Sequence, residues 1–383
     1  MLVDSLTIAT IPMYDNSAKA YKLGGVESYM RALAKAAHER GAKVDAYQIS
    51  DSEWSRDEGF FTLHGVPLKG GLFKSANQKL FEYARKRASA GGAIIISGDH
   101  MNVKTRDPRA IVVEHGIAFD YPIGGSGPAF WLKSFIKLLR CVRNVVRFQY
   151  VNNTVCVDYN HFNWLRTISS PQGGARMKVI LNFCSGFISD AEFEEKLASR
   201  KNRKRRIVFA RRFVWYRGTE LFANVAERLL REFRDIEITF AGEGPQEGIL
   251  REKFGSSENV KITSFHPDET FDFHRGFDIA VVPTIFSEGT SLSLIEAMGA
   301  GCLPVCTHVG GMTNIVVDGF NGLMSYPDED SFYECVRGAL LADSGRFDAM
   351  ARNARETAKM GLDYGSWSEK WISFIDRTVA ARG

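Results

Sequence analysis

The sequence lacks an apolar run that could cross a membrane, and it is poor in cysteine. No stretch approaches the ~20 consecutive apolar residues that a transmembrane helix needs, and the first residues carry no basic region or cleavage site typical of a secretory signal. The six cysteines are scattered. The residues between Cys302 and Cys306 are typical of a buried strand and not of a metal site. We therefore expect reduced core thiols in a cytoplasmic protein.

Acidic residues are missing from one long segment. There is no Asp or Glu between Asp120 and Asp158, and at ~100° per residue the basic side chains of 130–148 fall within an arc of about 120°. A surface helix usually mixes charges of both signs. The pattern therefore indicates either contact with anionic lipid headgroups at the inner face of the cell membrane or a core-packed helix with a solvated basic face. The basic residues are Lys133, Lys137, Arg140, Arg143 and Arg147, and the opposite face carries Trp131, Phe135, Leu138, Val142 and Val145.

A second basic run covers residues 200–206. Such a run is either solvated or a further contact with lipid or nucleic acid. The net charge of the whole chain is only +4, which is small for this length. We therefore expect no nucleic-acid partner.

The sequence also lacks the Gly-x-Gly-x-x-Gly fingerprint after its first predicted strand. In dinucleotide-binding enzymes those glycines let the backbone approach a pyrophosphate. An oxidoreductase is therefore the weakest of the functional hypotheses, and the absence of nicotinamide or flavin absorbance would dismiss it.

What the sequence has is a regular alternation of short apolar runs and helical patterns, which predicts parallel sheets flanked by helices. With 383 residues, two domains are expected. The predicted fold is α/β, with two Rossmann-like doubly wound domains facing across a cleft and a C-terminal helix that crosses back to the first domain. The predicted parts are an acceptor-side domain at 1–185, a linker at 186–205, a nucleotide-sugar-binding domain at 206–362 and a C-terminal helix at 363–383.

The segment 287–298 is the one around which the rest is organised. It follows an apolar strand at 278–283, and it begins a helix because Ser and Thr at the junction are good N-cap residues. Glu288 lies before the first turn and Glu296 about two turns inside, an axial offset of roughly 12 Å. Free backbone N–H groups between them suit a phosphate. The spacing fits a nucleotide sugar, with Glu288 on sugar hydroxyls and Glu296 on the ribose, and it also fits a capping Glu with a solvent-facing one.

Other candidates follow predicted strands, at the edge where such sheets bind ligands. His115 can donate to a substrate hydroxyl or be structural, and His100 competes with it. Arg212 and Arg217 can neutralise a diphosphate leaving group or lie on the surface. Two glycine pairs allow close approach of a phosphate or nucleotide, and ordinary turns explain them as well. These pairs are Gly24 with Gly25 and Gly242 with Gly244.

Together, and in their order along the chain, the motifs resemble those of the retaining glycosyltransferases of family 4, which have the GT-B architecture. The block from Glu288 to Val305, with its Glu-x7-Glu spacing, is the most specific part. The resemblance implies transfer of a hexosyl unit from a UDP- or GDP-linked sugar to a saccharide or lipid-linked saccharide, in polysaccharide, lipopolysaccharide or glycolipid synthesis. It implies catalytic roles for His115, Arg212, Arg217 and Glu288. It implies donor contacts by Gly24, Gly25, Gly242, Gly244, Gly289, Thr290, Ser291, Leu292 and Glu296, with base selection near Phe265.

The chain departs from many relatives at two places. Arg217 stands where a Lys is common, and Thr290 and Ser291 stand where Phe-Gly is common, which leaves the donor sugar undetermined. No carboxylate is placed as a covalent nucleophile, so the resemblance implies front-face attack without a metal and with no cofactor besides the donor. The alternative function is a catalytically silent nucleotide-sugar-binding or membrane-surface scaffold protein.

Overall fold

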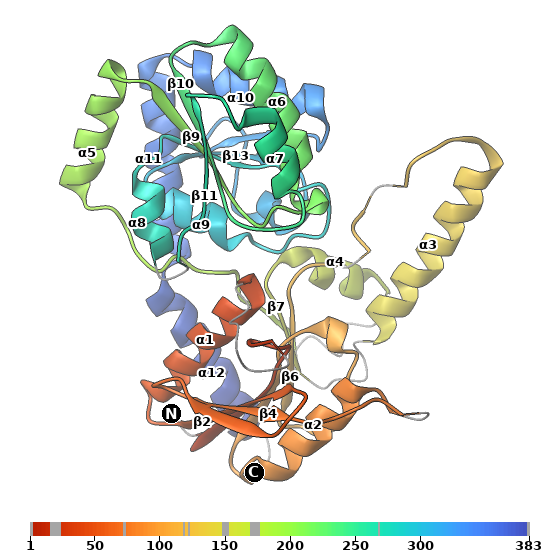
Figure 1. Ribbon diagram of the computed structural model, residues 1–383. Helices are drawn as coiled ribbons and strands as arrows, with labels where there is room; N and C mark the ends of the chain where they lie inside the picture. Colours follow the sequence, from red (N-terminus) through yellow and green to blue (C-terminus); the bar gives the residue numbers. More distant parts are fainter. Residues whose placement is uncertain are drawn as a thin grey trace. The chain divides into compact units, whose positions relative to one another are not determined.

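The computed structural model describes residues 3–15, 24–71, 74–117, 119–121, 123–147, 153–168, 177–266 and 269–380. The chain forms two compact units, and each contains one sheet with helices packed on it (Figure 1). The first unit consists of Met1–His115, Ile123–Ile180 and Gly365–Gly383. The second consists of Gly116–Pro122 and Leu181–Tyr364.

The sheet of the first unit has the strand order β3-β4-β2-β1-β5-β6-β7-β8, and only the pair β3 and β4 is antiparallel. Its central strands are fully buried apolar runs, as expected for parallel strands covered on both faces. The antiparallel pair at the edge is partly exposed, and the sequence analysis did not predict it. The strands are β1 (Ser5–Ala9), β2 (Lys43–Ile49), β3 (Trp54–Asp57), β4 (Thr62–Val66), β5 (Ala93–Ile96), β6 (Ala110–Glu114), β7 (Asn153–Cys156) and β8 (Met177–Val179).

The helices of the first unit include the last helix of the chain. In α12, the buried Trp371 donates its indole N–H to the hydroxyl of the buried Tyr29 in α1, at 2.7 Å. The ring of Trp367 also packs edge-on against Tyr29. These contacts join the last helix to the first. The helices are α1 (Gly25–His38), α2 (Ala76–Arg87), α3 (Gly127–Arg147), α4 (Tyr159–Ile168) and α12 (Tyr364–Ala380).

The sheet of the second unit is parallel throughout, with the order β11-β10-β9-β12-β13-β14. Numbered within the unit this is 3-2-1-4-5-6, so the direction of winding reverses between β9 and β12. Ligands of such sheets bind outside the carboxyl ends of the strands at this reversal. The predicted pair of parallel α/β sheets is confirmed. The strands are β9 (Arg205–Ala210), β10 (Ile236–Ala241), β11 (Val260–Thr263), β12 (Ile279–Val282), β13 (Leu303–Thr307) and β14 (Leu323–Ser325).

The helices of the second unit begin inside the segment that the sequence assigned to a linker. Residues 186–205 contain α5, which starts with a capping box in which the Ser189 hydroxyl accepts from the Glu192 amide and the Glu192 carboxylate accepts from Ser189. This segment therefore has regular structure. The helices are α5 (Asp190–Ser199), α6 (Thr219–Glu232), α7 (Glu247–Phe254), α8 (Thr270–Arg275), α9 (Leu292–Gly299), α10 (Glu329–Leu341) and α11 (Ser344–Gly361).

Among the described residues, no helix combines the length and the apolar composition needed to cross a bilayer.

Candidate functional site

The reversal point of the second sheet gathers side chains from two loops. The loop after β9 carries Arg211 and Arg217, and the loop after β12 carries Thr284 and Glu288 before it leads into α9. Because β9 and β12 are parallel neighbours, their carboxyl ends lie at the same edge of the sheet. The topology therefore brings residues 70 or more positions apart in sequence into contact.

Glu288 is the centre of this cluster. Its Oε2 atom accepts hydrogen bonds from the guanidinium groups of Arg211 and Arg217, and from the Thr284 hydroxyl at 3.0 Å. The Thr284 hydroxyl in turn accepts from Arg211. Burial alone would raise the pKa of Glu288, but the two guanidinium groups outweigh burial and hold that pKa below its usual value. Glu288 is therefore ionised near neutral pH.

The other carboxylate oxygen of Glu288, Oε1, is differently placed. It has no hydrogen-bond donor within reach in the described part of the chain. Since Oε2 carries all three bonds, the side chain is held rigidly while one acceptor stays open. An open acceptor on a fixed carboxylate is what binding of a sugar hydroxyl requires.

The backbone around Glu288 is also fixed. Ser287 has a left-handed φ of 53°, which is uncommon for a residue other than glycine, and its N–H donates to the Asp120 carbonyl at 3.0 Å. The Glu288 carbonyl accepts from the Gly311 N–H at 3.0 Å. A Cβ atom on Gly310 would fall 1.8 Å from that carbonyl oxygen, so a glycine is required there. Unusual backbone held by its surroundings is typical of functional sites.

The start of α9 leaves amide donors open. In the part of the chain that the structure describes, the N–H groups of Gly289, Ser291 and Leu292 have no acceptor, as expected for the first turn of a helix. Thr290 is held by Asn182, whose N–H donates to the Thr290 hydroxyl at 2.8 Å and whose side-chain amide donates to its carbonyl. The unusual Thr290 thus has a structural role, while the amides around it suit an anion.

Glu296 lies in the second turn of α9. Burial raises the pKa of its carboxyl group to about 8, and no partner for this side chain exists among the described residues. Its contacts differ from those of Glu288, although the sequence pattern treats the two alike. An unpartnered carboxyl at this position suits a ligand that offers hydroxyl donors.

The structure distinguishes two adjacent arginines that the sequence pattern could not. Arg211 is buried and bound to Glu288, whereas Arg212, which the motif selects, is exposed and has no partner in the described chain. Gly242 and Gly244 lie against the backbone of this loop. A Cβ atom on Gly242 would fall 2.0 Å from the Arg211 carbonyl oxygen and one on Gly244 2.5 Å from that of Phe213. These glycines allow the loop to pack closely, and their predicted contact with a nucleotide stays a prediction.

His115 follows β6 in the first unit. Its Nε2 lies 2.8 Å from the Ser97 carbonyl oxygen, which can only accept, so Nε2 carries the proton. Burial lowers the pKa of His115 to about 4, so the ring is neutral and Nδ1 is an acceptor. The sequence analysis has His115 donate to a substrate hydroxyl; here Nε2–H is used on Ser97, and the contact of His115 with a substrate stays a prediction. The competing His100 is exposed in a short 3-10 turn after β5.

The remaining predicted donor contacts lie at the ends of elements. Gly24 is the N-cap of α1 and Gly25 its first helical residue. Phe265 follows β11, and its partly buried ring stacks on Phe273 at 4.4 Å between centroids. The structure places these residues without testing their roles.

An aromatic cluster beside the arginines was missed by the sequence analysis. The ring of Phe286 lies 5.0 Å from Trp215, 5.5 Å from Tyr216 and 6.0 Å from Tyr121, measured between centroids. Trp215 and Tyr216 precede Arg217, and Phe286 precedes Glu288 by two residues. A Trp and a Tyr next to a motif arginine are the only sequence signal for it.

The basic run at 200–206 is largely occupied by contacts within the second unit. Arg203 forms two bonds with the buried Asp278, at 2.7 and 2.8 Å. Arg200 pairs with Asp348 at 2.5 Å, and Arg205 donates to the Leu340 carbonyl. The run is therefore explained by packing and does not form a free basic patch.

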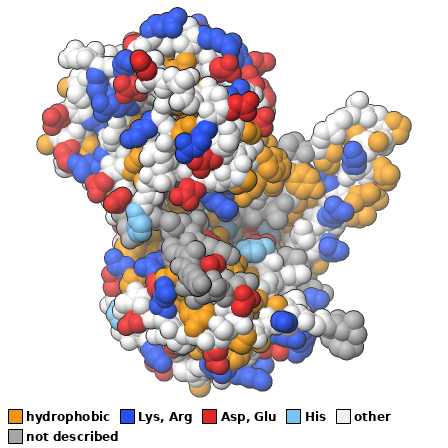
Figure 2. Space-filling model, viewed as in Figure 1, with side chains coloured by type: hydrophobic (Ala, Val, Ile, Leu, Met, Phe, Trp, Pro, Cys, Tyr) orange, Lys and Arg blue, Asp and Glu red, His pale blue; other side chains and the backbone are white. Residues whose placement is uncertain are grey.

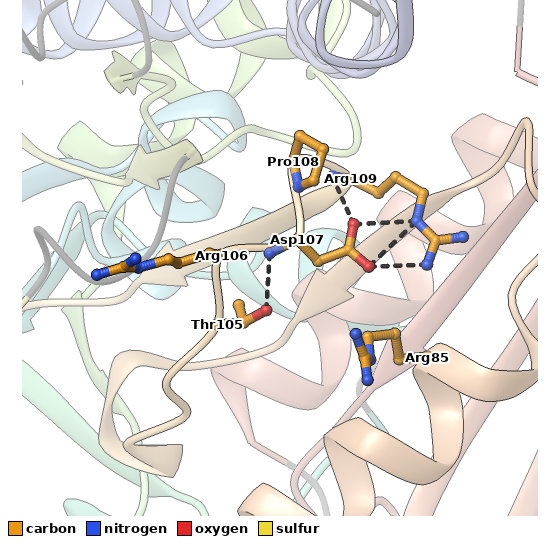
Figure 3. A pocket seen from close by; sticks show the side chains of 6 residues that line it. All are labelled: Arg85, Thr105, Arg106, Asp107, Pro108 and Arg109. Carbon is orange, nitrogen blue, oxygen red and sulfur yellow. Dashed lines mark hydrogen bonds and ion pairs between the residues drawn. The ribbon is translucent and has the colours of Figure 1, made fainter.

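A hollow of about 420 Å³ lies elsewhere in the first unit (Figure 3). It is lined by Arg85, Thr105, Arg106, Asp107, Pro108 and Arg109, and the Asp107 carboxylate faces the Arg109 guanidinium at 2.7 Å. This segment precedes β6, so it lies at the amino ends of the strands, away from the edge where ligands bind. In the described residues, no three His, Cys, Asp or Glu side chains gather as a metal site would need.

Comparison with known proteins agrees with this geometry. Residues 204–342, which include β9, β12 and α9, match the family model described as Glycosyl transferases group 1. The solved sucrose-phosphate synthase from Thermosynechococcus elongatus is similar over 99% of this chain and 100% of that chain, with a TM-score of 0.72 and 16% identity. HepE from Anabaena in complex with UDP-glucose is similar over 98% of this chain and 99% of that chain, with a TM-score of 0.68 and 13% identity. The chain has the GT-B fold.

Among curated relatives, the GT-B chain is 28% identical over 178 residues to a D-inositol 3-phosphate glycosyltransferase from Xylanimonas cellulosilytica, which is 44% of this chain and 41% of that protein. It is 27% identical over 109 residues to a glycogen synthase from Rhizobium etli, which is 28% of this chain and 22% of that protein. The chain thus spans less than half of the length of the curated relatives it matches.

Proposed function

We propose that this protein is a retaining glycosyltransferase that moves a hexosyl unit from a nucleotide sugar to a saccharide or lipid-linked saccharide. The observation that carries the proposal is the geometry of Glu288. Its Oε2 is held by Arg211, Arg217 and Thr284 while Oε1 stays open. This carboxylate stands at the reversal point of a doubly wound sheet, directly before the open amides of α9.

Each residue has a distinct role in the proposed reaction. The open Oε1 of Glu288 accepts from hydroxyls of the donor sugar, and the amides of Gly289 and Leu292 bind the diphosphate at the helix start. Glu296 accepts from the ribose. The exposed Arg212, together with the free N–H groups of Arg217, neutralises the charge that grows on the leaving diphosphate.

The bond changes balance without a protein nucleophile. The bond between the anomeric carbon and the phosphate oxygen breaks, and a bond from that carbon to the acceptor oxygen forms on the same face. The acceptor proton passes to the departing diphosphate. The proposed mechanism uses no metal and no cofactor, because Arg212 and Arg217 supply the positive charge.

UDP-glucose is the first donor to test, since the similarly folded HepE was solved with it. GDP-linked sugars are the second set. The names of the curated relatives offer phosphorylated inositol and glycogen-like glucans as acceptors, and the lipid-linked saccharides of polysaccharide and lipopolysaccharide synthesis are the third class.

The decisive experiment measures nucleoside diphosphate release and product formation over a panel of donors and acceptors. Glu288→Gln removes the charge that Arg211 and Arg217 bind, and we expect activity to fall by about 100-fold or more. The matched control is Glu252→Gln on α7, an exposed carboxylate without a partner in the described chain. Proton NMR of the product reports whether the anomeric configuration is retained. Full activity in Glu288→Gln, or no turnover by the wild type with any donor that binds, contradicts the proposal.

A further inference from the structure

The helix α3 leaves most of its apolar side chains outside the protein. Trp131 is 71% exposed, Phe135 57% and Leu139 55%. Figure 1 shows α3 projecting from its unit, and Figure 2 shows hydrophobic side chains gathered along it with Lys and Arg among them. Large exposed apolar patches on a folded protein mark a surface that binds a partner. The exposed apolar residues are Trp131, Leu132, Phe135, Ile136, Leu138, Leu139 and Val142, here called the outer face.

The side of α3 that packs on the protein is narrow. Cys141 and Val145 are buried, and Ser134 is partly buried on the same side of the helix. At ~100° per residue these three positions, together with the partly buried positions 130, 137 and 144, cover an arc of about 100°, while the outer face covers about 160°. Within the described part of the chain, the expectation of a core-packed helix is therefore wrong for the outer face, which is exposed, while the opposite side of α3 is buried or partly buried.

The charges on α3 indicate what kind of partner its outer face binds. Lys133, Arg140 and Arg143 are exposed, and at ~100° per residue they fall in an arc of about 80° that meets the edge of the outer face. No acidic residue lies between Asp120 and Asp158. The side chain of Arg147 lies outside the described residues. A helix with an apolar sector bordered by positive charge alone matches a surface that is apolar inside and anionic outside.

We propose that α3 lies in the interface of an anionic lipid bilayer, with its outer face among the acyl chains and its basic residues on the headgroups. The inference is independent of the proposed sugar transfer, because it rests on the first unit and on no donor or acceptor. It rests on α3 alone, since the basic run at 200–206 is occupied. A second copy of this chain is the competing occupant, and the test separates the two.

The test is sedimentation of the full chain with vesicles of phosphatidylcholine alone or mixed with phosphatidylglycerol, without nucleotide sugar. We expect strong binding to the mixed vesicles, weak binding to the neutral ones, and weaker binding as salt rises. Phe135→Ser with Leu139→Ser should lower binding at least about tenfold. Lys133→Gln with Arg140→Gln should lower binding to the mixed vesicles on the order of 30-fold and weaken its dependence on salt.

The control variants remove exposed apolar or basic side chains from parts of the surface outside α3. Leu341→Ser with Met360→Ser removes two exposed apolar side chains of the second unit, and Arg85→Gln with Lys86→Gln removes two exposed charges of α2. All variants change exposed side chains, so their melting temperatures should match the wild type, which shows that they fold. The proposal is overturned if the two test variants and the two control variants all reduce binding equally. It is also overturned if the wild type stays in the supernatant with both vesicle types.

Two further readouts settle the occupant. The difference in fluorescence between the wild type and Trp131→Phe isolates the indole at position 131, and its emission should shift to shorter wavelength when mixed vesicles are added. Sedimentation velocity without lipid should show the same monomeric species for the wild type and for Phe135→Ser with Leu139→Ser. A wild-type dimer that this pair abolishes makes a second copy the occupant and overturns the membrane proposal.

Discussion

The same substitution should have different effects at the two neighbouring arginines after β9, lowering stability at Arg211 and activity alone at Arg212. The Arg211 side chain is 7% exposed, and its guanidinium group binds Glu288. Arg211→Met removes that group. Removing one partner of a buried ion pair typically costs about 3–5 kcal/mol. Because Glu288 keeps Arg217 and Thr284, we expect a smaller loss of about 2 kcal/mol. For a domain of this size that lowers the melting temperature by about 4–8 °C.

Arg212→Met is the matched change one residue along the chain. The Arg212 side chain is exposed and has no partner in the described residues, so the free energy of unfolding should change by less than about 0.5 kcal/mol. If Arg212 meets the leaving diphosphate, kcat/KM should nevertheless fall by about 100-fold or more. Urea unfolding and transfer rates, measured on both variants, separate stability from catalysis.

The pH dependence gives a third readout on Arg211→Met. The folded-state pKa of Glu288 is depressed, so its contribution to stability is present above the unfolded pKa and is lost as pH falls through the folded one. The variant should therefore differ most from the wild type above about pH 4.5 and approach it at lower pH. A stable, inactive Arg211→Met together with a destabilised Arg212→Met would refute the placement of both arginines.

Three further changes test other parts of the structure. The raised pKa of Glu296 favours its neutral form in the folded state, so the wild type should lose stability as pH rises from about 4.5 to about 8. Glu296→Gln should not show this loss, and melting temperatures across that pH range measure the difference. His115→Gln should reduce the loss of stability on acidification from about pH 6.5 to about pH 4, because His115 is held neutral, and a wild type equally stable at both ends would contradict this. Trp371→Phe removes the indole N–H that Trp371 donates to the buried Tyr29 hydroxyl and should cost about 1–3 kcal/mol in urea unfolding, whereas a change within error would show that the contact contributes little.

Much of the fold was predictable because the central strands are continuous apolar runs. The apolar segment 278–283 was predicted as a strand, and its residues Ile279–Val282 form β12. The antiparallel edge pair β3 and β4 was missed, since its partly exposed strands bury too little to show an apolar run. Helix α5 was missed because its composition is polar, although the spacing of Ser189 and Glu192 was a usable signal.

Glu288 and Arg217 were predicted from the sequence, whereas Arg211, Thr284 and the contacts that join them to Glu288 were not. The spacing of Glu288 and Glu296 showed that both lie on one helix start, yet their surroundings give one a depressed pKa and the other a raised one. The choice between Arg211 and Arg212 depends on which side chain the loop turns toward β12, and that follows from tertiary packing. The binding partner of Thr290 is 108 positions away, beyond the reach of any local pattern.

The two glutamates of α9 and its preceding loop should bind different ends of one ligand, and calorimetry measures this most directly. Titrations of UDP and of UDP-glucose, with GDP and GDP-sugars as the second set, compare the wild type with Glu288→Gln and Glu296→Gln. We predict that Glu296→Gln weakens both the free nucleotide and the nucleotide sugar, while Glu288→Gln weakens only the nucleotide sugar. Equal weakening of both ligands by Glu288→Gln, or no binding of any of them to the wild type, would contradict the account.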